Sequence, residues 1–74
     1  MNDRLSGLVI DFFNKISYYI MEEYPDYYNS FHNEKELAKT FEMVEKYYLG
    51  GNNAEDTAGF MVDYLKGKEN GRPI

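Results

Sequence analysis

The side chains that could perform nucleophilic catalysis are few, because the chain has one histidine, His32, and no cysteine. The nearest serines in the sequence are Ser17 and Ser30. A serine nucleophile needs a neighbouring base that a third group orients. Neither serine stands in a Gly-x-Ser-x-Gly turn, which would expose such a nucleophile. We therefore interpret His32 as a structural or surface histidine, and we predict that the protein is not an enzyme.

Three carboxylates, Glu22, Glu23 and Asp26, lie close enough in the sequence to suggest metal binding or paired acid and base chemistry. They lack the alternating oxygen ligands and central glycine of a calcium loop, and the Glu-x-x-His motifs of a dinuclear helical site are missing. Gly50 and Gly51 have no Gly-rich, Lys-containing loop around them, as a phosphate site requires. The sequence thus predicts no metal and no cofactor, and it favours a solvated acidic rim.

Residues 17–31 (SYYIMEEYPDYYNSF) form the segment that most resembles a binding surface, with five tyrosines and a phenylalanine among three carboxylates. Tyrosine offers a large contact area at low entropic cost, and its ring attracts Lys and Arg. We predict a Tyr-rich acidic face that binds basic side chains of a partner. Its residues are Tyr18, Glu22, Glu23, Tyr24, Asp26, Tyr27 and Tyr28. The alternative is that many of these rings belong to the core, as Tyr19 does by its helical register.

The charge balance indicates what kind of partner to expect. Thirteen acidic and eight basic side chains give a net charge of −5. The residues from Lys66 onward carry +2, which leaves −7 for residues 1–65. Direct binding to nucleic acid needs Lys or Arg against phosphates and is not expected here. A larger protein with a basic surface, for instance a nucleic-acid-binding protein, fits better.

Three amphipathic segments must position the Tyr-rich acidic face, so the predicted fold is all-α, a small three-helix bundle. With 74 residues the chain can build one core, which we expect to be rich in aromatic rings. The first helix covers residues 3–24 and ends before Pro25. The second runs from an N-cap at Asn33, with Glu36 in a capping-box position, to Gly50 in the C′ position. The third starts at an Asn53 cap and returns antiparallel to the second.

The apolar residues of the three helices recur at spacings of three and four. The first apolar arc is wide enough to need both other helices or a second copy of the chain. The expected core positions are Leu5, Leu8, Val9, Phe12, Phe13, Ile16, Tyr19, Ile20, Leu37, Phe41, Val44, Tyr48, Ala58, Met61, Val62 and Leu65.

Two segments lack a helical period. Residues 25–32 (PDYYNSFH) are expected to form an ordered aromatic loop between the first two helices, with rings that fold back on the core. Residues 67–74 (GKENGRPI) are expected to form a flexible basic tail, so the predicted domain covers residues 1–66.

These observations favour a small acidic inhibitor or adaptor that occludes a basic surface of a larger protein. In kind, though not by a shared motif, the chain is similar to the small acidic inhibitors of phages and toxin-immunity systems. The alternatives are a self-associating structural or regulatory homodimer and a weak nucleic-acid mimic, although charges of both signs are too interspersed for a strong one. No membrane span or signal peptide is expected, and the lack of cysteine fits a cytoplasmic location.

Overall fold

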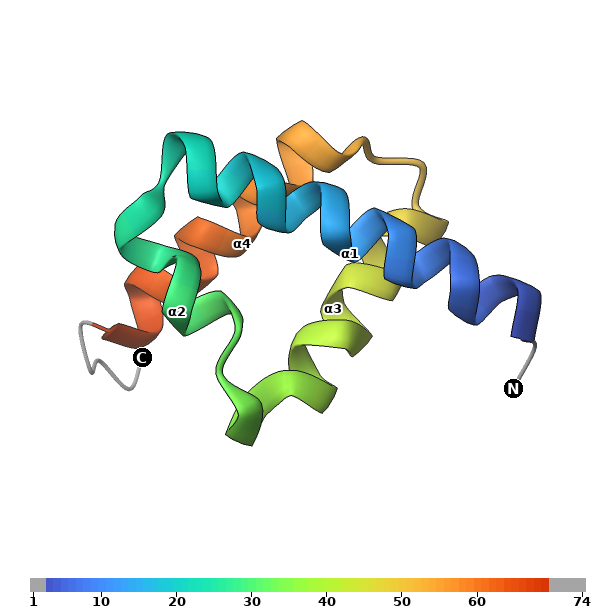
Figure 1. The fold of residues 1–74 in the computed structure, drawn as a ribbon, viewed down its shortest axis with the longest axis horizontal. Coiled ribbons are helices and arrows are strands. Elements are labelled where there is room, and N and C mark those ends of the chain that lie inside the picture. Colours follow the sequence, from blue (N-terminus) through green and yellow to red (C-terminus); the bar gives the residue numbers. More distant parts are fainter. Residues whose placement is uncertain (1–2, 70–74) are drawn as a thin grey trace.

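The structure, a computed structural model, describes the backbone of residues 3–69 and the side chains of residues 6–68. This part of the chain contains helices and turns but no strand, so the all-α prediction is confirmed. Four α-helices and two 3-10 turns follow one another (Figure 1). Their bounds are α1 Asp3–Glu23, η1 Pro25–Tyr27, α2 Tyr28–Phe31, η2 Glu34–Glu36, α3 Leu37–Leu49 and α4 Ala54–Glu69.

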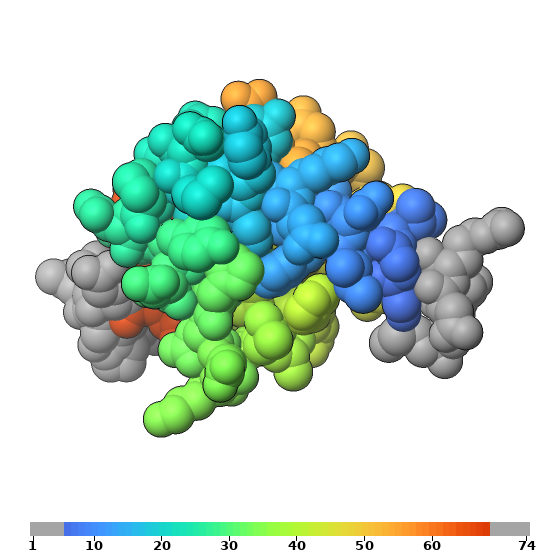
Figure 2. All heavy atoms as spheres, in the orientation of Figure 1, coloured from blue at the N-terminus to red at the C-terminus, as the bar shows by residue number. Residues whose placement is uncertain are grey.

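The central element is α1, which crosses the whole molecule and is the main packing partner of both α3 and α4 (Figure 1). Its N-terminal half lies against α3, and its C-terminal half lies against α2 and α4. Figure 2 shows that α1 also lies at the surface of the molecule, on the face that is in view. One long helix therefore carries the core on one side and an open surface on the other.

The segment predicted to be an aromatic loop is helical, which corrects the sequence-based expectation. Pro25 occupies the first turn of η1, where its fixed φ and missing N–H are tolerated, and α2 follows directly. The backbone at Tyr24 has φ −138° and ψ 55°, so α1 ends at Glu23, one residue earlier than predicted. Phe31, at the end of α2, is completely buried. The rings of this segment do fold back on the core, but from helical turns.

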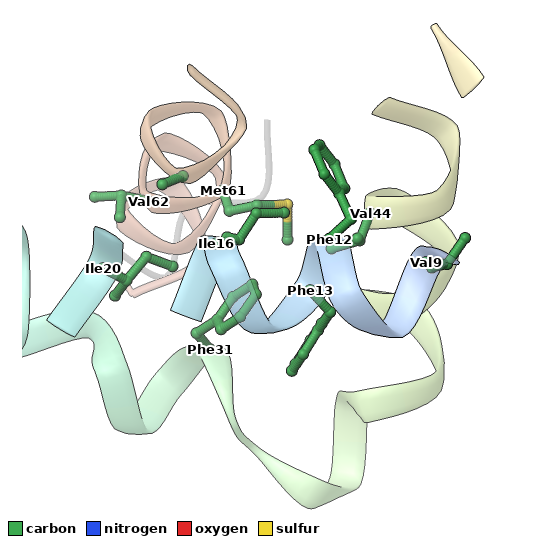
Figure 3. Close-up of a cluster of buried hydrophobic side chains, with 10 residues drawn as sticks. Val9, Phe12, Phe13, Ile16, Ile20, Phe31, Val44, Met61 and Val62 are labelled. Atoms are coloured by element: carbon green, nitrogen blue, oxygen red, sulfur yellow. The ribbon is translucent and has the colours of Figure 1, made fainter. Parts of the chain in front are cut away.

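Aromatic rings dominate the centre of the core. Phe13 lies between Phe31 and Phe41, with ring centroids 4.7 Å and 4.5 Å apart and both pairs stacked. Phe12 makes an edge contact with Tyr48 at 5.3 Å. Figure 3 shows the aliphatic part of the core beside these rings, where side chains from α1, α3 and α4 meet. The buried hydrophobic residues are Val9, Phe12, Phe13, Ile16, Ile20, Phe31, Val44, Ala58, Met61 and Val62.

The ends of α3 are organised differently from the prediction. At its C-terminus the left-handed residue is Gly51, with φ +84°, and not Gly50. The N–H groups of Gly51 and Asn52 donate to the carbonyls of Tyr48 and Tyr47, as in a Schellman motif. At its N-terminus, Asn33 caps the η2 turn by accepting from the Lys35 N–H.

Two further contacts concern the predicted caps. Glu36 does not close a capping box; its carboxylate forms an ion pair with Lys68 of α4 instead. Asn53 caps α4 as predicted, because its side chain accepts a hydrogen bond from the Asp56 N–H at 2.7 Å.

The connection of α3 to α4 follows the predicted direction. Tyr47 of α3 stacks on Phe60 of α4, and Glu36, directly before α3, pairs with Lys68 near the end of α4, so the two helices run antiparallel. However, α4 continues to Glu69 and so includes the first three residues of the predicted tail. The rest of that tail, residues 70–74, lies outside the described residues. No helix in the described range is long and apolar enough to cross a membrane.

Candidate partner-binding surface

The structure divides the predicted Tyr-rich acidic face into an exposed part and a packed part. Tyr18 is 56% exposed, and the carboxylates of Glu22, Glu23 and Asp26 are exposed as well. Among the described residues, none of these three carboxylates forms an ion pair with a Lys or Arg side chain. They therefore keep their charge available on the C-terminal half of α1 and on η1.

The other three tyrosines of this face are half-buried and pack against the core. The Tyr24 hydroxyl lies beside Gly59 of α4, 3.9 Å from where a Cβ would be. The Lys66 ammonium lies 5.9 Å from the centre of the Tyr27 ring. The Tyr28 ring lies 4.6 Å from the His32 ring. These three rings thus pack largely against other residues of the chain, and Tyr18 is the most exposed tyrosine of residues 17–31.

Two depressions meet at Tyr18. One, of about 700 Å³, lies between α1 and the start of α4, where Asp11, Lys15 and Glu55 line it. The other, of about 270 Å³, lies between α1 and α2. Tyr18 and Asn14 line both. A side chain that stands between two hollows offers a partner both an anchor and recesses on either side of it.

Two residues of this surface were not among those predicted from the sequence. Asn14 lies one turn before Tyr18, and Met21, which is 49% exposed, lies almost one turn after it. Both share the helical face of Tyr18, so the spacing of three and four would have identified them. We call the surface formed by Asp11, Asn14, Tyr18, Met21 and Glu22, all of them exposed, the outer face of α1.

Next to this face, the structure brings together the serine and histidine that the sequence analysis considered separately. The Ser17 hydroxyl and His32 Nε2 are 2.9 Å apart, and either group can donate, depending on the imidazole tautomer. The rings of Phe13, Tyr28 and Phe31 surround the imidazole at centroid distances of 4.6–5.4 Å. Burial lowers the pKa of His32 below its usual 6.5, because the charged form loses solvation.

The Ser17–His32 pair lacks the other parts of a hydrolytic centre. Among the described residues, no carboxylate contacts the imidazole to orient it. Ser17 is only 8% exposed and lies in the middle of α1, where backbone N–H groups are used within the helix and cannot stabilise an oxyanion. The pair is therefore best understood as a tertiary link between α1 and the end of α2. The absence of enzymatic activity stays a prediction.

No group of three His, Cys, Asp or Glu residues in the described part of the chain is arranged to hold a metal ion.

The side chain of one predicted core residue, Leu5, lies outside the described range; among the others, one lies on the surface. Leu8 is 46% exposed, and its neighbour Ile10 is 50% exposed. The start of α4 lies beside Asp11 and Lys15, about one and two turns further along α1, and so α4 does not cover Leu8. The wide apolar arc of the first helix is thus filled only in part within one chain.

Comparisons with known proteins add no relative: no protein-family model, curated protein or solved structure matches this chain.

Proposed function

We propose that this chain is a non-enzymatic protein-binding module, an inhibitor or adaptor of the kind used by phages or immunity systems. It binds a basic surface of a larger protein, for instance a nucleic-acid-binding protein, through the outer face of α1. The lack of cysteine suits a reducing compartment such as the cytoplasm.

The observation that supports this proposal most is the position of Tyr18. Its ring is more than half exposed and stands between two depressions, with Met21 on the same face. Aromatic side chains near the centre of an interface contribute most of the binding energy in many complexes. Asp11 lies two turns before Tyr18 and Glu22 lies one turn after it, so Lys and Arg of a partner can approach both the ring and the carboxylates.

The first experiment locates the contact. A photo-crosslinking amino acid at position 18 should capture a partner from a lysate of the source cell, whereas the same group at position 60 should not. Phe60 is a suitable comparison because it is 42% exposed but lies on α4. Equal capture from both positions would contradict the proposed site.

The second experiment uses the captured partner in purified form. Tyr18→Ala should weaken binding roughly thirtyfold, the equivalent of the ~2 kcal/mol that a hot-spot side chain contributes. Glu22→Lys should weaken binding, and Asp63→Lys, the same charge reversal on an exposed position of α4, should have a smaller effect. The helical circular dichroism of all three variants should stay unchanged. Unaltered affinity of both Tyr18→Ala and Glu22→Lys would refute the proposal.

The alternatives give different results in these assays. A nucleic-acid mimic would lose affinity steeply with ionic strength, whereas a contact anchored by Tyr18 would weaken modestly. A homodimer is favoured by one observation, the exposure of Leu8 on α1. Light scattering behind a sizing column, at several protein concentrations, distinguishes a mass of one chain from a mass of two.

A further inference from the structure

We infer that the groove between α1 and α3 is a second docking site, and that it takes an amphipathic helix of a partner protein. That helix carries apolar residues one turn apart and Lys or Arg beside them. This inference does not depend on the outer face of α1, because the groove is formed by other residues.

The groove has a volume of about 430 Å³ and lies beside the N-terminal half of α1. Val9 and Ile10 of α1 form one wall, and Ala38 and Phe41 of α3 form the other. Ile10 stays 50% exposed, and no described segment of the chain covers it. Apolar surface that a small protein leaves open in a concave site is typical of a binding site.

The walls of the groove determine the shape of its occupant. Both walls are helices, which beyond their first turn use their backbone N–H and C=O groups within the helix. A partner strand would find no row of alternating N–H and C=O groups to pair with, so recognition must come mainly from side chains. An amphipathic helix satisfies its own backbone and can insert residues spaced three or four apart into such a groove.

The charge of the groove determines which residues should flank the apolar residues of the partner helix. Glu42 and Glu45 also line the groove, and neither forms an ion pair with a Lys or Arg of the described residues. Lys or Arg on the partner helix would complement them. A second copy of this chain fits less well, because its own exposed Ile10 is followed by Asp11, and a twofold contact over the groove would bring carboxylates together.

A second docking site has a consequence for the type of activity. The groove and the outer face of α1 share no residue. A chain with two separate sites can hold two partners, or two segments of one partner, at once. This arrangement favours an adaptor over a simple inhibitor.

The test uses a displayed library of helical peptides, selected for binding to the full chain. We expect the selected peptides to carry apolar residues three or four positions apart together with Lys or Arg. Ile10→Glu should reduce their affinity at least tenfold, and it should not unfold the chain because Ile10 is half exposed. The double variant Glu42→Lys, Glu45→Lys should also reduce it, whereas Asp63→Lys should not.

Several results would overturn the inference. They are a selection without binders, peptides that lack the spacing or the positive charge, and peptides insensitive to Ile10→Glu but sensitive to Tyr18→Ala. The last result would leave the proposed function intact, because it would place binding on the outer face of α1. A dimer that Ile10→Glu converts to a monomer would show that the groove takes a second copy of the chain.

Discussion

Phe31→Ala is the substitution that tests the architecture most directly, because it removes the largest completely buried side chain of the described residues. Phe31 belongs to α2, the helix that replaces the predicted loop. Its ring ends a stack of three, 4.7 Å from Phe13, which in turn lies 4.5 Å from Phe41. Loss of the ring would leave a cavity and free α2 from α1.

The expected cost follows from the size of the ring and its complete burial. A buried phenylalanine removes at least about 150 Å² from water, worth about 4 kcal/mol at about 25 cal/mol per Å². Substitutions of this type in protein cores cost about 3–5 kcal/mol. A chain of 74 residues has a total stability of about 4–11 kcal/mol. We expect a loss of about 3 kcal/mol or more, and a fall in Tm of at least about 12 °C where the variant still folds.

The assay is urea unfolding followed by circular dichroism, with Phe60→Ala as the matched control. Phe60→Ala removes the same atoms as Phe31→Ala, but Phe60 is 42% exposed and stacks on Tyr47 at 5.2 Å. Its truncation should cost less than half as much. If Phe31→Ala costs less than about 1 kcal/mol, or no more than Phe60→Ala, α2 is not docked and residues 25–32 form the loop that the sequence suggested.

The remaining predictions concern a titrating group and two glycines. Because burial lowers the pKa of His32, its contribution to stability is complete above pH 6.5 and is lost as the pH falls through the lower pKa of the folded state. The midpoint of urea unfolding should therefore fall as the pH is lowered below 6.5, and His32→Gln should remove that part of the pH dependence. The same pH dependence of the midpoint in both proteins would contradict this prediction. Gly59→Ala should stabilise α4 by about 0.5–1 kcal/mol, since the new Cβ meets only the Tyr24 hydroxyl at 3.9 Å. Gly51→Ala should destabilise the chain by about 1 kcal/mol, because the backbone there has φ +84°. Thermal unfolding measures the change in stability of both glycine variants, and a change of the same sign in the two would refute the reasoning.

The long helices could be predicted from the sequence because their apolar residues repeat over several turns. Phe12, Val44 and Met61 are buried as their register predicts. A repeat of this kind averages over many positions, so single exceptions do not obscure it. Leu8 is such an exception: it fits the apolar arc of α1 but lies beyond the reach of α4.

The short elements could not be predicted in the same way. Four residues make one turn of α2, which is too short to show a period, and tertiary contacts of Phe31 hold it in place. The Ser17–His32 link depends on that turn, because it joins residues fifteen positions apart. The sequence pattern also cannot decide whether Gly50 or Gly51 takes the left-handed conformation at the end of α3, since either glycine can adopt a positive φ.

The tyrosines show where the helical register stops being informative. Tyr18 lies within α1, where the periodicity that buries Ile16 and Ile20 turns it outward, together with Asn14 and Met21. Tyr27 and Tyr28 lie beyond Pro25, where the register of α1 no longer applies, and they turn back toward the core. The register of α1 therefore explains the exposure of Tyr18 but does not extend to Tyr27 and Tyr28. An exposed face was thus predictable for the α1 part of the run, and there the proposed binding surface should have included Met21, whose position follows from the register that exposes Tyr18.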